Sequence, residues 1–417
     1  MQARQLVAYN FQGTFKGMGR GITVIEALPY LPVTFDNSHW CLPNTTTCLW
    51  PTLMIFVNGD ISISDLSIHI TATNGTATVP QPDGGNTYIE TGIRIMGRYT
   101  TNVHIDRVEE EGRPDNTSPF GYNVTNGIGY MGELISSPDP FDSRCGAAGG
   151  LYFMSGTYTV RNSSFKSMTV GVGQDGCVRS SQITIGGSPF TGNTFEDHWA
   201  GIDLESAENS SFEVSYNTSS AIGNSMWVIP WIESIFLPSK PSRYLIHDNT
   251  FITTGTSSFI GDVAGILLYS DTPDNPWIDA VIWNNSIQLQ ESPSDGIDAV
   301  NTKGTVILNN TVTGSGWDAV GLYGSTSSTL MLNNVSGFTP DSSTGSTAQI
   351  YLDSGTNRNL VVCAESTDTV LNQGTNNVVV GCQQAATTPE AETRSEAPGS
   401  SVPHLRFPIG KHPPYRP

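Results

Sequence analysis

The chain has 417 residues, with 19 Lys and Arg against 38 Asp and Glu and a formal net charge of -19 at pH 7. This excess of negative charge argues against polyanionic partners and excludes nucleic acid and anionic membrane surfaces from the expected ones. Only 14% of the residues are charged, and Gly, Ser, Thr and Asn are abundant, which is typical of a β-rich protein with many tight turns. No apolar run is long enough for a transmembrane helix, so no membrane insertion is expected.

A short repeat runs along the chain, in which a small residue precedes a strand that alternates apolar and other residues. Met1 to Gln5 leads straight into strand-like sequence without a visible signal peptide. Copies of the repeat begin at Thr91, Gly149, Ala200, Ala264, Asp295 and Asp318. The small residue lets the backbone turn tightly before the strand. Because one such strand cannot bury its apolar side alone, the repeat predicts stacked coils that share an interior.

A second strand follows most copies and ends in asparagine. The pairs at these ends are Tyr216-Asn217, Asp248-Asn249, Asn284-Asn285, Asn309-Asn310 and Asn333-Asn334. Asparagine tolerates the left-handed backbone conformation, and its amide can hydrogen-bond to the amide of the next coil. This pattern at coil spacing predicts an all-β, single-stranded parallel β-helix. A β-sandwich would not produce it.

Three segments interrupt the repeat and one follows it. Val79–Asn86, Arg113–Cys145 and Trp227–Ser242 are rich in turn residues or irregular in pattern, which predicts long loops. After Cys382 the composition changes to Ala, Thr, Pro, Glu and Ser. We therefore expect one β-helix domain over residues 1–384 and a low-complexity, disordered tail over residues 385–417.

The cysteines and glycosylation sequons predict a secreted protein. Six cysteines are compatible with three disulfides, paired as Cys41–Cys48, Cys145–Cys177 and Cys363–Cys382. Stacked strands lie ~4.8 Å apart, within the range that a disulfide between successive coils accepts. Sequons occur at Asn44, Asn74, Asn116, Asn123, Asn162, Asn209, Asn217, Asn284, Asn309 and Asn334. For Asn284, Asn309 and Asn334, a structural role in the turns is the stronger interpretation.

The opening Phe11-Gln12-Gly13-Thr14-Phe15-Lys16-Gly17-Met18-Gly19 resembles the first coils of many members of the pectin-lyase-like superfamily. The resemblance extends from about Phe11 to Cys382 and implies a right-handed parallel β-helix. Since members usually begin with a coil or cap before this opening, part of the N-terminal end is expected to be missing. Members usually hold a polysaccharide in a groove along the outside of one sheet. None of the polygalacturonase motifs occurs here, so no catalytic residue is carried over, and fold alone does not define a function.

The outward positions of the repeat strands form the candidate site. If Ile202 and Leu204 point inward, Asp203 and Glu205 point out. The same register turns further side chains outward that could line a glycan-binding groove: Arg94, Tyr152, Tyr269, Asp298 and Tyr323.

Asp203 and Glu205 are the candidate catalytic pair. Residues two apart on a strand are ~6.6–6.8 Å apart at the backbone, and inverting glycosidases hold their carboxyls roughly 6.5–9.5 Å apart. One carboxyl would act as acid and the other as base, with His198 as a neighbouring proton carrier. The alternative is that the two acids are merely solvated on the strand.

A uronate lyase would need a tyrosine base, such as Tyr152 or Tyr269, and Arg94 or Ca²⁺ to stabilise the intermediate. Cationic residues are scarce on this face, which favours a glycoside hydrolase over a lyase. A non-catalytic glycan-binding or structural cell-surface protein is the alternative function. The expected partner is a polysaccharide, no cofactor is expected apart from Ca²⁺ for a lyase, and the chain is expected to be a monomer.

Overall fold

The computed structural model describes residues 2–3, 6–27, 52–70, 89–97, 101–114, 124–132, 154–174, 178–204, 207–228, 240–254, 263–270, 278–290, 295–341 and 348–385. These residues belong to two compact units. Unit 1 contains most of the chain before Ile183, and unit 2 most of the chain from Ile183 onward. We describe each unit by itself.

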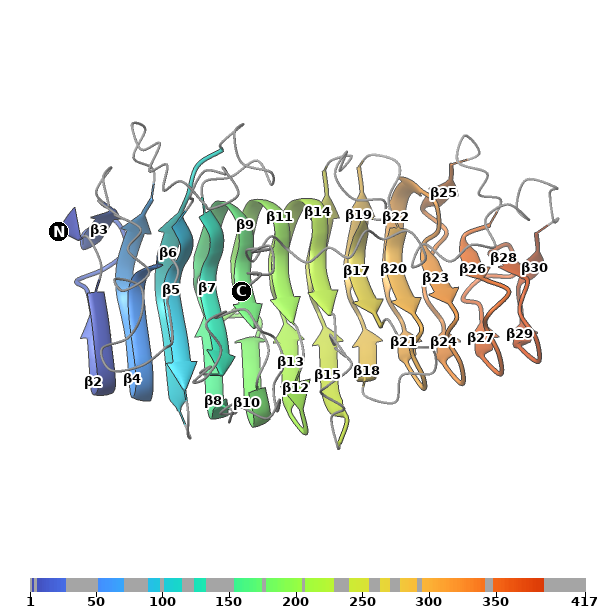
Figure 1. Ribbon diagram of the computed structural model, residues 1–417. Helices are drawn as coiled ribbons and strands as arrows, with labels where there is room; N and C mark the ends of the chain where they lie inside the picture. Colours follow the sequence, from blue (N-terminus) through green and yellow to red (C-terminus); the bar gives the residue numbers. More distant parts are fainter. Residues whose placement is uncertain are drawn as a thin grey trace, which may run out of the picture. The chain divides into compact units, whose positions relative to one another are not determined.

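Unit 1 is built from strands that pair in parallel with strands of the following coils (Figure 1). They are β1 (Gln2–Ala3), β2 (Leu6–Lys16), β3 (Val24–Ala27), β4 (Thr52–His69), β5 (Ile89–Gly97), β6 (Asn102–Glu111), β7 (Val124–Gly132), β8 (Met154–Arg161) and β9 (Ser164–Gln174). Strand β10 (Val178–Gly186) includes the boundary between the units. The long β4 pairs with β5, β6 and β3 along its length, so one continuous strand contributes to three faces of a coil.

Unit 2 repeats this arrangement in shorter strands. They are β11 (Thr194–Leu204), β12 (Ala207–Glu208), β13 (Ser211–Ser215), β14 (Thr218–Val228), β15 (Ser242–His247), β16 (Thr250–Thr253), β17 (Ala264–Tyr269), β18 (Ile278–Trp283), β19 (Ser286–Leu289), β20 (Asp295–Val300), β21 (Val306–Leu308), β22 (Thr311–Gly316), β23 (Val320–Tyr323), β24 (Thr329–Met331), β25 (Phe338–Pro340), β26 (Ile350–Leu352), β27 (Leu360–Val362), β28 (Thr369–Asn372), β29 (Val378–Val380) and β30 (Gln383–Gln384).

The strands of unit 2 form three faces around one interior. Face 1 holds the C-terminal parts of β11 and β14 followed by β17, β20, β23, β26 and β28. Face 2 holds β13, β15, β18, β21, β24, β27 and β29. Face 3 holds the N-terminal parts of β11 and β14 followed by β16, β19, β22 and β25. The fold is the predicted right-handed parallel β-helix, which is confirmed.

The repeat strands of face 1 share one interior row of apolar side chains. In successive rungs of the ladder this row is Ile202, Met226, Ile266, Ile297, Val320, Ile350 and Val370. Ile202 and Ile297 are both fully buried. The glycine at the second position of β20 has a steric reason: a Cβ on Gly296 would lie 2.3 Å from the carbonyl oxygen of Ala319. Close approach of neighbouring coils therefore selects the small residue.

A buried asparagine ladder closes the turn between faces 2 and 3 in unit 2. Each side chain donates through Nδ2 to Oδ1 of the asparagine in the next coil, from Asn193 through Asn217, Asn249, Asn285 and Asn310 to Asn333. The residue before most of these asparagines adopts positive φ. The predicted stacking is confirmed, although in the last pair the ladder residue is Asn333 and not Asn334. Asn217 is therefore a buried sequon, whereas Asn284, Asn309 and Asn334 are exposed.

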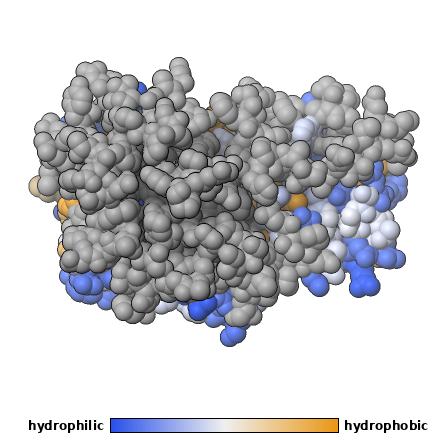
Figure 2. Space-filling view, in the orientation of Figure 1, coloured by the Kyte–Doolittle hydropathy of each residue, from blue (hydrophilic) through white to orange (hydrophobic). Residues whose placement is uncertain are grey.

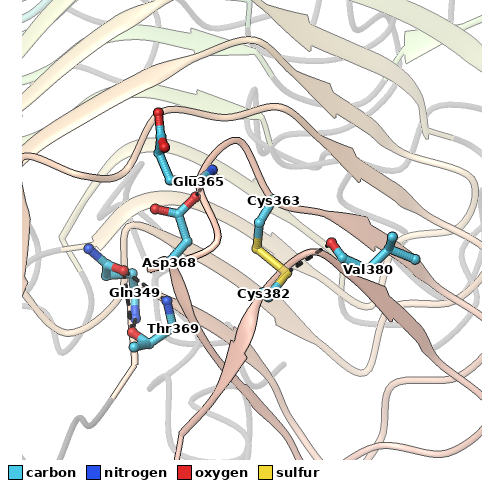
Figure 3. The surroundings of a disulfide bond; sticks show 7 residues. All are labelled: Gln349, Cys363, Glu365, Asp368, Thr369, Val380 and Cys382. Atoms are coloured by element: carbon cyan, nitrogen blue, oxygen red, sulfur yellow. Dashed lines mark hydrogen bonds between the residues drawn. A yellow bond between two sulfur atoms is a disulfide. The ribbon is translucent and has the colours of Figure 1, made fainter.

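A disulfide replaces the asparagine ladder in the last two coils. Cys363 follows β27, Cys382 follows β29, and their Cα atoms are 5.4 Å apart (Figure 3). The predicted Cys363–Cys382 pair is thus confirmed, and it joins adjacent coils covalently. The predicted pairs Cys41–Cys48 and Cys145–Cys177 lie outside the described residues.

On the face shown in Figure 2, most described side chains are hydrophilic, and hydrophobic ones appear as small separate spots. Within the part of the chain that is described, no helix has the length and apolar character needed to cross a bilayer.

Candidate functional site

The predicted carboxylates Asp203 and Asp298 of unit 2 lie on the outer side of face 1, but they are buried. Asp203, Trp227, Leu267 and Asp298 occupy one outward row in four successive rungs. Asp203 is only 4% exposed and Asp298 only 3% exposed. These two carboxylates are therefore shielded from solvent, and a glycan-binding groove at these positions stays a prediction.

The structure does not bring the predicted residues together in one constellation. Asp203 and Asp298 are three rungs apart, which corresponds to ~14 Å at the usual strand spacing. Tyr269 and Tyr323 share another outward row two rungs apart, and Tyr323 is buried. Arg94 is buried in unit 1, where its guanidinium donates to Thr91. Glu205 and Tyr152 lie outside the described residues, so the Asp203–Glu205 pair stays a prediction.

His198 lies on the inner side of its strand. It is fully buried, and its ring meets that of Phe195 edge-on at 6.0 Å between centroids. A bulge at Asp197, which has a φ of 55°, shifts the register there. The outward residue is instead Trp199, whose ring is 5.1 Å from Trp227. His198 therefore does not neighbour the outward carboxyl of Asp203, because the strand separates them.

A different group of residues forms a partly exposed site at the end of face 2. We call Glu213, Tyr216, His247, Asp248 and Trp283 the aromatic–acid cluster. The His247 ring stacks on Trp283 with centroids 4.0 Å apart and an angle of 12°. Tyr216 meets His247 edge-on at 5.9 Å. Three aromatic side chains from neighbouring coils are thereby fixed on the outer wall of unit 2.

Two carboxylates flank the imidazole of this cluster. His247 Nδ1 is 2.7 Å from Asp248 Oδ2, and its Nε2 is 3.6 Å from Glu213 Oε1. Ser215 donates to the same Glu213 oxygen at 3.3 Å. The two carboxylates thus hold the imidazole in one orientation from both of its nitrogens.

The electrostatics of the cluster keep Asp248 ionised and Tyr216 protonated. Burial tends to raise the pKa of Asp248, but hydrogen bonds from His247, Asn284 and Tyr216 outweigh it and bring the pKa below its ordinary value. Burial together with the nearby Asp248 and Glu213 carboxylates raises the pKa of Tyr216. The cluster therefore offers carboxylate acceptors and a phenol donor beside an aromatic surface.

The cluster could not be found from the repeat strands, because its residues lie on the second strand of each coil and in the turn that follows. A signal was present in the sequence: Tyr216 and Asp248 precede the ladder asparagines, and His247 and Trp283 each precede such a pair. Among the described residues, no group of three or more His, Cys, Asp and Glu side chains is arranged to hold a metal ion.

Comparison with known proteins finds only distant structural neighbours. No protein-family model and no curated protein matches the chain. Two solved structures are similar, and both are mutants of the tailspike protein of E. coli bacteriophage HK620 in complex with a pentasaccharide. One has 10% identity and a TM-score of 0.34, the other 11% identity and a TM-score of 0.31. Each match covers 88% of this chain and 73% of the tailspike chain. Similarity at this level is too distant to inform function.

Proposed function

We propose that this protein binds a neutral polysaccharide on the outer wall of unit 2, at the aromatic–acid cluster. The observation that carries the proposal is the stacked His247–Trp283 pair held between carboxylates at the surface. Sugars present both C–H surfaces and hydroxyl groups. Aromatic side chains pack against the former, and the carboxylates of Glu213 and Asp248 accept hydrogen bonds from the latter.

The charge of the protein supports a neutral glycan over a polyuronate. The net charge of the chain is -19, and the two acidic side chains of the cluster add a local negative potential that would repel a polyanion. We place the binding outside the cell, because disulfides such as Cys363–Cys382 persist in oxidising compartments. Membership of the pectin-lyase-like superfamily is part of the same proposal.

Affinity electrophoresis in gels that contain neutral plant, algal or fungal polysaccharides, or polyuronates, tests the proposal. Trp283→Ala should abolish the retardation by a neutral polysaccharide that the unchanged protein shows. His104→Ala is the matched control, since His104 is an exposed residue on the outer side of β6 in unit 1. Equal retardation of the Trp283→Ala protein and the control protein would contradict the proposal, as would retardation by polyuronates alone.

Hydrolysis of a glycan on face 1 of unit 2 is the second candidate function. Asp203 is a buried carboxyl one rung from Trp227, which itself contacts Trp199. A carboxyl shielded from water beside aromatic rings is an environment in which glycosidases place a general acid. New reducing ends without absorbance near 235 nm would indicate hydrolysis, and Asp203→Ala should abolish them. Release of unsaturated products would indicate a lyase instead.

A further inference from the structure

An apolar stripe occupies the outer side of face 2 in the last four coils of unit 2. It consists of two parallel rows, Val306, Thr329, Leu360 and Val378 in one and Leu308, Met331, Val362 and Val380 in the other. All eight side chains are at least partly exposed, and Val378 and Val380 are 55% and 48% exposed. The alternate residues Ile307, Leu330 and Val361 are buried in the interior. Both sides of this part of face 2 are thus apolar, although only the inner side serves the core.

The chemistry of the stripe fits a protein surface and not a glycan. Of its eight side chains, only Thr329 can form a hydrogen bond, and none is charged. A glycan needs partners for its hydroxyl groups, because unpaired polar groups are costly to desolvate. Two apolar sheet surfaces, in contrast, pack face to face ~10 Å apart with interdigitating side chains. Contiguous apolar surface of this kind marks a protein interaction site.

We propose that the occupant of the apolar stripe is a second copy of this chain. A two-fold axis parallel to the direction in which the coils stack would place each row of one copy against the other row of its partner. Three of the four rungs then pair a smaller side chain with a larger one: Val306 with Leu308, Thr329 with Met331, and Val362 with Leu360. The fourth pairs two valines. This complementarity gives a nearly even gap, which close packing requires.

Charged residues at the borders of the stripe favour the same two-fold axis, parallel to the stacking direction. Arg358 lies just before β27 at one border, and Glu365 lies after it at the other; both are exposed. Because they belong to the same coil, this two-fold axis brings Arg358 of each copy to Glu365 of the other. The stripe has eight residues per copy, fewer than the ~20–30 of a standard interface, so the dimer should dissociate on dilution.

Sedimentation equilibrium of the full chain over a range of concentrations tests the proposal. The unchanged protein should show a reversible monomer–dimer equilibrium, and Met331→Lys should remain monomeric at concentrations where the unchanged protein is dimeric. Ser62→Lys is the control, since Ser62 is a partly exposed outward residue on the corresponding face of unit 1, and it should dimerise normally. A melting curve establishes that the variants are folded. A protein that stays monomeric at all concentrations would overturn the proposal.

A charge exchange tests the arrangement without altering the apolar stripe. Arg358→Glu should weaken dimerisation roughly tenfold, since two ion pairs are replaced by repulsion. The double variant Arg358→Glu, Glu365→Arg should restore it, because the opposed charges are exchanged in both copies. Failure of the double variant to restore dimerisation would overturn the two-fold arrangement. Dimerisation through the apolar stripe does not depend on glycan binding at the aromatic–acid cluster, so either property can be absent while the other is present.

Discussion

The two units close the same turn, between faces 2 and 3, by opposite means. In unit 1 the turn has apolar residues inside, Leu66 and Val108, and charged residues outside, where Arg107 binds Asp65 through Nε at 2.6 Å and Nη2 at 3.0 Å. In unit 2 the buried position is an asparagine in coil after coil. One fold thus accepts either an exposed ionic ladder or a buried amide ladder at the same place.

This difference in the turn determines how strongly salt and pH affect the stability of each unit. The buried amide of Asn285 satisfies backbone groups of its own and the preceding coil and bonds the amide of the next. Such a ladder is indifferent to salt and to moderate pH. An exposed ion pair contributes little and is weakened by salt and acid. The outer side of face 2 also differs in polarity between the units. Unit 1 has the polar residues Asn102, His104 and Asp106 there, whereas the last four coils of unit 2 have the apolar stripe.

The largest expected effect comes from breaking the amide ladder. Asn285→Ala removes a side chain that donates to Asn310 Oδ1 and to the carbonyl of Ile246 and that accepts from the Asn249 backbone N–H. Because several buried groups lose their partners, unfolding free energy should fall by about 3 kcal/mol or more. Chemical denaturation measures this free energy of unfolding. Gln288→Ala, at an exposed outward position of β19 in the same coil, should change this free energy by less than about 0.5 kcal/mol.

Removing the disulfide should have the next largest effect. Cys363 and Cys382 are separated by 19 residues, and closing a loop of this length stabilises a protein by about 3 kcal/mol in the chain-entropy model. Replacing both cysteines with serine should therefore lower stability by up to this amount. Hydrogen exchange should show the loss first in β29 and β30, which the disulfide holds to the preceding coil. Uniform loss across unit 2 would contradict this local role.

Replacing Glu110 should stabilise unit 1 at neutral pH. Its carboxyl is fully buried in the inward row between Ile68 and Phe165 and has no hydrogen-bond partner, and burial raises its pKa well above the ordinary value. The folded state therefore keeps the proton while the unfolded chain loses it, so stability falls as pH rises above the ordinary pKa.

Glu110→Gln is neutral at every pH and should remove this loss. The melting temperature near pH 8 should rise by about 1 °C for a gain of about 1 kcal/mol, since an unfolding entropy of ~2.1 cal/mol/K per residue amounts to roughly 0.9 kcal/mol/K over 417 residues. The gain should disappear near pH 4, where the unfolded chain is protonated too. The matched control is Glu111→Gln, at the partly exposed next position. A gain that does not depend on pH would contradict the explanation.

The smallest effect is expected at the ionic turn of unit 1. The hydrogen bonds of Arg107 lower the pKa of Asp65 to about 2. An acid with a lowered pKa stabilises the folded state at pH values above its ordinary pKa of 3.8. This stabilisation is lost as the pH falls toward 2. In Arg107→Ala the pKa of Asp65, followed by NMR titration, should return toward 3.8. High salt should produce part of the same change in the unchanged protein, and an unaltered pKa would contradict the assignment.

The sequence predicted the strands and their inward residues much better than the environment of the outward residues. The alternation around Ile202 and Ile297 correctly assigned which residues point inward, because the two-residue period of a strand is a local property. The same alternation could not show that the outward Asp203 and Asp298 are buried, or that a bulge at Asp197 turns His198 inward. Burial of an outward side chain depends on chain segments that are distant in sequence.

By itself, the sequence determined the coil, its interior row, the stacked asparagines and the Cys363–Cys382 pair. Each of these follows from periodicity and from the spacing of adjacent rungs. Only the tertiary structure decided which outer residues meet: His247 with Trp283, Asp65 with Arg107, and the two rows of the apolar stripe. The number of residues between strands varies from coil to coil, so the register that makes them neighbours is set by packing across the coils and not by any local pattern.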